Sequence, residues 1–198
     1  MICTLPSALV NHISNRTFVN VFTVIVLLVK ARVINKVYNS TGAGLPLATG
    51  ASTKHFKSIF LDVGLAQRLL GVEYNDWVIR NSILDSHRGA VAEQFIGQEL
   101  LHRFGDHEDP QLYYWHRQSN GSQAEVDYLY EAHNNALPIE VKSASIGHLR
   151  SMQQYLKTYK QAKYGVKCSL APLTRQSKII NIPLYAIEKT KSITDELE

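Results

Sequence analysis

Glu140 and Lys142 stand two residues apart in the strand-like run of residues 137–142. Because side chains alternate between the two faces of a strand, this carboxylate and this amine point toward the same small volume. The preceding strand-like run, residues 124–130, carries Asp127 on its polar face. Carboxylates and an ammonium group held together in this way suit a site that binds a divalent cation and acts on a phosphate.

A hairpin between the two runs would bring the two acidic residues together. A turn centred between His133 and Asn134 places Asp127 directly opposite Glu140, where the Cβ atoms of cross-strand neighbours are about 4.5–5.5 Å apart. Two like charges at that distance destabilise a sheet unless something compensates them. Magnesium is typically held by one or two carboxylates together with water and phosphate oxygens, so we expect a divalent cation between these side chains.

A third carboxylate, Glu93, lies on a helical segment, and the other residues on its face are apolar or small: Ile96, Gly97, Leu100 and Phe104. A buried charge without a partner is costly, so Glu93 needs one. The metal site is one candidate partner. Pairing with Arg103 or Lys142, or a side chain that reaches solvent, are the alternatives. Gly97 would let the helix approach the sheet closely.

Taken singly, each of these residues has an ordinary structural explanation. A Glu-x-Lys on a strand is usually a surface salt bridge, and Asp127 alone could be a solvated strand residue. The specificity comes from their order along the chain: Glu on a helix, Asp on a strand, Glu-x-Lys on the next strand, then a second helix. This order predicts one shared site of Glu93, Asp127, Glu140 and Lys142.

The elements that must position this site are predicted from periodicity and turn residues. They are a helix over residues 89–104, strands at 112–116, 124–130 and 137–142, a helix over 146–160, and strands at 165–170 and 179–182. This order favours an α/β arrangement in which a sheet is buried between helices. Before them, residues 27–38 are expected to end a helix and start a short strand. Residues 58–61 resemble a strand, and Asp62 can cap the turn that Gly71 ends.

The composition fits a globular protein with one domain, or with one domain plus a small appendage. The chain has 198 residues, of which 45% are hydrophobic and 19% charged, and its formal net charge is +4. This mild positive charge is compatible with a nucleic-acid partner without requiring one. Cys3 and Cys168 lie far apart without metal-ligand spacing, as expected of reduced thiols in a cytoplasmic protein. The apolar run 18–29 is shorter than the roughly 20 residues of a membrane-spanning helix, so no membrane partner is expected.

Five stretches carry a resemblance to a known family: KSIFLDVGL at 57–65, GAVAEQF at 89–95, LYYW at 112–115, AEVDY at 124–128 and PIEVKS at 138–143. In them the chain resembles domain-of-unknown-function family 4143, the C-terminal region of a group of bacterial and archaeal AAA-type ATP-binding proteins. More broadly, it resembles the PD-(D/E)XK, restriction-endonuclease-like nuclease superfamily. The resemblance covers roughly residues 27–170.

The resemblance implies a restriction-endonuclease-like α/β core: a helix, a three-stranded mixed or antiparallel sheet, a second helix and a further strand. A small helical or winged-helix-like remnant would precede it. We expect this remnant at residues 1–50, the core at 51–188 and a polar tail at 189–198.

The superfamily also implies roles for the site residues. Asp127 and Glu140 would be metal ligands for magnesium or manganese, and Glu93 would bind the metal directly or through water. Lys142 would orient or activate the attacking water. Two features depart from the relatives: His116 stands where most have Arg, and the second helix lacks a Gln-xxx-Tyr motif.

Full-length relatives carry an ATPase module before this region, whereas no GxxxxGK[ST] phosphate loop occurs here, so ATP hydrolysis by this chain is not expected. The chain looks like a truncated or split relative. The first hypothesis for its function is a metal-dependent phosphodiesterase that acts on DNA. The alternative is a catalytically silent module that binds nucleic acid or a partner protein, such as an ATPase module. A third possibility is self-association through the apolar residues 18–29.

Overall fold

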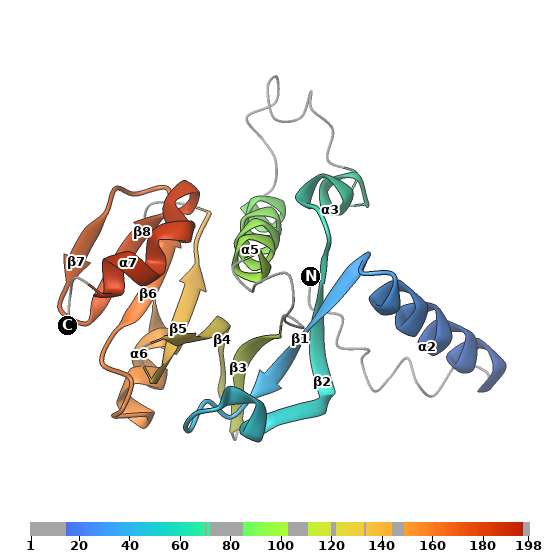
Figure 1. Ribbon diagram of the computed structural model, residues 1–198, viewed down its shortest axis with the longest axis horizontal. Coiled ribbons are helices and arrows are strands. Elements are labelled where there is room, and N and C mark those ends of the chain that lie inside the picture. The colour runs from blue at the N-terminus through green and yellow to red at the C-terminus, as the bar shows by residue number, and fades with distance from the viewer. Residues whose placement is uncertain are drawn as a thin grey trace.

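The computed structural model describes residues 15–69, 71, 85–102, 111–119, 122–132, 134–143 and 149–195. Over these ranges a single eight-stranded sheet runs across the protein, and helices pack on it (Figure 1). The helices are α2 (Asn15–Lys30), α3 (Val63–Leu69), α5 (Asp85–Leu101), α6 (Arg150–Thr158) and α7 (Thr190–Asp195), with the 3-10 helices η1 (Leu47–Gly50) and η2 (Leu184–Lys189). The strands are β1 (Ile34–Ser40), β2 (Ala51–Phe60), β3 (Leu112–Ser119), β4 (Ser122–Ala132), β5 (Asn135–Val141), β6 (Gly165–Ser169), β7 (Thr174–Gln176) and β8 (Ile179–Pro183).

The predicted order of elements around the candidate site is confirmed. Helix α5 is followed by β3, β4 and β5, then by α6 and β6. Boundaries differ by a few residues, because turn residues at the ends of β3 and β4 still complete ladder pairs such as Ser119 with Ser122. The start of the second predicted helix, residues 146–148, lies outside the described residues, and so does the end of the first, residues 103–104.

The sheet is larger than the three-stranded core that the sequence predicts. Its strand order is β2-β1-β3-β4-β5-β6-β8-β7. Strand β1 lies inside it, paired antiparallel with β2 and parallel with β3. Residues 34–40 therefore belong to the sheet, although they fall within the stretch 1–50 that was expected to form an appendage. Strand β2 also begins earlier than the predicted run at 58–61, at Ala51.

Two hydrophobic cores cover the two faces of the sheet. On one face, Ile96 and Leu100 of α5 and Ile187 of η2 pack against apolar side chains of the central strands. On the other face, Met152 and Tyr155 of α6 pack against β3 and β4. The arrangement of a sheet buried between helices is confirmed, and α5 and α6 hold β3, β4 and β5 between them.

Each end of the described chain carries a helix. Helix α2 lies at the β1 and β2 end of the sheet (Figure 1), and its Val24 and Leu27 are exposed. Over the described ranges, no helix has both the length and the apolar character needed to cross a bilayer. At the other end, α7 occupies much of the expected polar tail and buries Thr190 and Thr194.

Local turn chemistry follows the sequence closely at α3. The Asp62 carboxylate accepts hydrogen bonds from the backbone N–H groups of Gly64 at 2.8 Å and Leu65 at 3.3 Å, which caps the helix as predicted. Gly71 follows the helix with a φ of +67°, the left-handed conformation that glycine adopts without strain.

Gly97 brings α5 onto the sheet at the point where β4 passes beneath it. A Cβ atom at this position would overlap the Tyr128 hydroxyl and lie 3.0 Å from the Ile59 side chain. That hydroxyl donates a hydrogen bond to the Glu93 carbonyl at 2.9 Å, so the missing side chain of Gly97 makes room for a contact that ties helix to strand. The close approach predicted from the sequence is confirmed.

Replacing Gly97 by alanine is expected to lower the free energy of unfolding by about 1–3 kcal/mol through overpacking. Gly89 is the matched control, because it lies in the same helix and a Cβ there meets nothing within 4 Å. Gly89→Ala should raise stability by roughly 0.5–1 kcal/mol through helix propensity. Urea unfolding of both variants measures the two effects, and effects of the same sign would contradict this packing.

Candidate functional site

The hairpin of β4 and β5 has the register that the sequence predicts. Its pairs run from Ala132 with Asn135 to Tyr128 with Ile139. The pairing ends there, one residue before Asp127 and Glu140 would stand opposite each other. The Asp127 carboxylate reaches across to β5 and accepts a hydrogen bond from the backbone N–H of Val141 at 2.7 Å.

A β-bulge in β4 changes the direction of the side chains at this point. Tyr113 of β3 pairs with Leu129 and Trp115 pairs with Val126, so two residues of β4 stand opposite the single Tyr114. Those two residues are Asp127 and Tyr128. A bulge re-aims side chains next to it, and here Tyr128 is buried beneath α5 while Asp127 contacts the neighbouring strand.

Glu93 points from α5 to a partner that the sequence reasoning missed, Lys57 of β2. The Lys57 ammonium lies 2.5 Å from one Glu93 oxygen and 3.7 Å from Glu125. It also lies 4.8 Å from the ring centre of Tyr128 and 5.3 Å from that of Tyr114. Lys57 is only 2% exposed, so a full positive charge is held inside the protein by these groups.

Glu140 and Lys142 form the pair that their spacing predicts. The Lys142 ammonium donates to Glu140 Oε1 at 2.7 Å. The second carboxylate oxygen, Glu140 Oε2, is buried and has no hydrogen-bond partner within the described ranges. A buried polar atom without a partner is costly, so this oxygen is a candidate ligand for a bound group.

The pKa values of Asp127, Glu140 and Glu125 are raised. Burial raises the pKa of Asp127 most, and the neighbouring Glu93 and Glu140 add to it against the opposing Lys57 and the Val141 N–H, giving a pKa of about 8. Burial also raises the pKa of Glu140, against the opposing effect of Lys142, and that of Glu125, against Lys57. These carboxyl groups are therefore difficult to ionise together without additional positive charge.

The pKa values of the two lysines are also raised, which favours their charged forms. Burial lowers the pKa of Lys57, but Glu93, Asp127 and Glu125 outweigh burial and raise it above its usual value. The pKa of Lys142 is raised in the same way, mainly by the hydrogen bond and charge of Glu140. Both lysines stay charged, so the cluster of four carboxyl groups and two ammonium groups would carry an excess of two negative charges if all its acids were ionised.

The four predicted site residues lie in one region but do not all contact one another. Lys142 pairs with Glu140, and Asp127 bonds to the Val141 N–H of the same hairpin. Glu93 pairs with Lys57, and its negative charge raises the pKa of Asp127. Across the described segments, no three His, Cys, Asp or Glu side chains are arranged to hold a metal ion. The set of three carboxylate ligands expected from the sequence is thus not assembled in this structure.

Lys57 could have been found from its strand pattern. Lys57 and Ile59 are buried on β2 with more accessible residues between them, the period of two that marks one face of a strand. A lysine whose side chain points to the buried, apolar face of a strand implies a buried acidic partner. The sequence predicts this strand only from residue 58 onward, which leaves Lys57 outside it.

A comparison with protein-family models identifies the chain. The model for Domain of unknown function (DUF4143) matches residues 88–187, just over half of the chain, which span α5, the β4–β5 hairpin, α6 and the strands after it. The chain belongs to this family. A search of curated proteins and a search of solved structures each found no significant match.

Replacing Lys57 by methionine is expected to lower the free energy of unfolding by about 3 kcal/mol at pH 7, because Glu93 and Glu125 lose their buried counter-charge. The loss should shrink at low pH, where these carboxyl groups are protonated. Lys54→Met on the exposed part of the same strand is the control, with an expected change within about 0.5 kcal/mol. Equal losses in chemical denaturation would show that the Lys57 charge is not buried with its partners.

The raised pKa of Asp127 predicts how stability changes with pH in metal-free buffer. With a folded-state pKa of about 8 and an ordinary value of 3.8, the folded protein keeps a proton that the unfolded chain has lost. The stabilisation is complete below pH 3.8 and is lost as the pH rises toward 8, by up to about 1.4 kcal/mol per pH unit. Asp127→Asn should flatten this slope while keeping an acceptor for the Val141 N–H. Unfolding titrations between pH 5 and 8 measure it, and identical slopes for both proteins would contradict the assignment.

Proposed function

We propose that the chain is a metal-dependent phosphodiesterase with a PD-(D/E)XK-like site, acting on nucleic acid and most directly on DNA. The observation that carries this proposal is the set of contacts at the end of one hairpin. The Asp127 carboxylate bonds to the Val141 N–H at 2.7 Å, and the Lys142 ammonium lies 2.7 Å from the neighbouring Glu140. The order of helix, three strands, helix and strand around this pair supports the same superfamily.

The residues present fit a divalent cation bound by two carboxylates. Glu140 Oε2 lacks a hydrogen-bond partner in the described part of the chain, and the cluster would carry two excess negative charges on full ionisation. A divalent cation supplies that missing charge, and magnesium is commonly held by one or two carboxylates plus water and phosphate. Asp127 and Glu140 would hold it. Glu93, engaged by Lys57 at 2.5 Å, supports the site from α5 in place of the direct or water-mediated metal contact that the resemblance implies.

The chain's own groups have separate roles in this proposal. When bound, magnesium or manganese would supply Lewis-acid polarisation of a phosphate. Lys142 places a positive charge beside that position, where negative charge develops during attack on phosphorus, and can hold a water by hydrogen bonding. Lys57 keeps Glu93 and Glu125 in place, and Tyr128 fixes α5 through the Glu93 carbonyl.

Cleavage of plasmid and single-stranded DNA in the presence of magnesium or manganese tests the proposal. Asp127→Asn, Glu140→Gln and Lys142→Met should each lower the cleavage rate by roughly 100-fold or more. Glu188→Gln removes a carboxylate of an exposed ion pair and should leave the rate unchanged. Chelation of the metal should abolish cleavage by the unaltered protein.

Metal binding has a readout that does not depend on turnover. Either cation should raise the unfolding temperature of the unaltered protein and of Glu188→Gln, but not that of the Asp127→Asn/Glu140→Gln double variant. If no cleavage occurs and the cations leave every unfolding temperature unchanged, the enzyme proposal fails. DNA binding without cleavage would then favour the catalytically silent module.

A further inference from the structure

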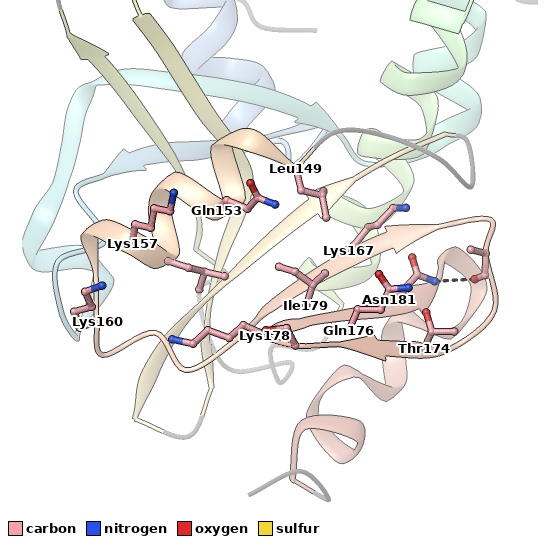
Figure 2. A pocket seen from close by; sticks show the side chains of 13 residues that line it. Leu149, Gln153, Lys157, Lys160, Lys167, Thr174, Gln176, Lys178, Ile179 and Asn181 are labelled. Carbon is pink, nitrogen blue, oxygen red and sulfur yellow. Dashed lines mark hydrogen bonds between the residues drawn. The ribbon is translucent and has the colours of Figure 1, made fainter.

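A second charged feature lies beside the candidate site. A cavity of about 790 Å³ opens between α6 and the strands β6, β8 and β7 (Figure 2). In the view of Figure 2, the helix forms one wall, and the turn between β7 and β8 lies across from it. None of the residues that line this cavity belongs to the carboxylate cluster, so the two features are distinct.

Four lysines line this cavity, which we call the lysine cavity: Lys157 and Lys160 at the end of α6, Lys167 on β6, and Lys178 between β7 and β8. Its lining, all within the described residues, includes no Asp or Glu. Lys157, Lys160 and Lys178 are exposed, and in Figure 2 they lie toward one end while Lys167 lies toward the other. Like charges gathered around one hollow repel each other, and they favour an anionic occupant.

The charge of the cavity indicates an occupant with more than one phosphate. A single phosphate ester carries at most about two negative charges, whereas three exposed lysines, Lys157, Lys160 and Lys178, line one end of this hollow. A strand with successive phosphates can meet them in turn. Gln153 and Gln176 add amide donors suited to phosphate or sugar oxygens. The described lining has no aromatic side chain, so contacts would be made to the backbone rather than by base stacking.

The cavity is connected to the carboxylate cluster through adjacent strands. Lys167 is the register partner of Glu140 on the parallel strands β5 and β6. Neighbouring strands lie about 4.8 Å apart, so one end of the lysine cavity starts next to the site residue that carries the unpartnered oxygen. A strand lying in the cavity would have a phosphate within reach of that site.

We propose that the lysine cavity binds the phosphate backbone of a nucleic-acid strand, without regard to base sequence, and leads it to the carboxylate cluster. This inference rests on the proposed function where it names nucleic acid as the polyanion, but binding can be measured without cleavage. Backbone binding through lysines releases counterions, so affinity must fall steeply with salt.

The test is fluorescence anisotropy of a labelled oligodeoxynucleotide with the full chain in chelator, where no cleavage occurs. The variant Lys157→Gln/Lys160→Gln/Lys178→Gln should bind at least about tenfold more weakly, and its salt slope should fall by about three. The matched control, Lys30→Gln/Lys54→Gln/Lys189→Gln, removes the same charge from exposed positions outside the cavity and should change affinity less than about twofold. Circular dichroism and the unfolding temperature confirm that both fold.

Each remaining outcome decides between the two proposals. Equal weakening by both triple variants, or no binding by the unaltered protein, overturns the cavity assignment. Binding lost with the cavity lysines but no cleavage by any protein keeps this inference and removes the phosphodiesterase. Cleavage that survives intact in the cavity variant, with unchanged binding, keeps the phosphodiesterase and removes this inference. Tighter binding of anionic lipid vesicles or free inorganic phosphate than of the oligonucleotide also overturns it.

Discussion

A buried positive charge constrains the middle of this protein. Lys57 is 2% exposed, and the cost of removing an ammonium group from water has to be met by nearby negative charge. Glu93 from α5 and Glu125 from β4 supply it, together with the ring faces of two tyrosines. Three elements distant in the chain are thereby fixed relative to one another, because separating any of them would leave an unpaired charge in the interior.

Because Lys57 engages two of the four acids, negative charge that Lys57 does not balance remains at the β4–β5 hairpin. With Glu93 and Glu125 engaged by Lys57, the remaining acids are Asp127 and Glu140, and Lys142 pairs with Glu140. The bulge in β4 sends Tyr128 under the helix and leaves Asp127 hydrogen-bonded to β5. The proton held by Asp127 at a pKa of about 8 is one way to relieve this charge, and a cation is another.

Positive charge gathers next to this acidic cluster, around strands β6, β7 and β8. Four lysines surround the lysine cavity, and the strand pairing of Lys167 with Glu140 joins it to the acidic cluster. In the proposals made above, the acidic cluster would take a cation and the basic hollow would take phosphates of the same polyanion. The net charge of +4 conceals this separation, because it averages the two regions.

The sequence by itself determined what depends on neighbours along the chain. Alternation and turn residues were enough for the β4–β5 register, the pairing of Glu140 with Lys142, the cap at Asp62 and the close approach at Gly97. Each of these depends on a short-range period or on one side chain that a turn or contact requires.

The tertiary structure alone decided the pairings between distant segments. It placed β1 inside the sheet, gave Glu93 to Lys57, and inserted a bulge that no local pattern marks. It also gathered Lys157 and Lys178 around one cavity. These features depend on which strands become neighbours, and that choice minimises the combined cost of buried charge and unfilled space across the whole chain, which no local window contains.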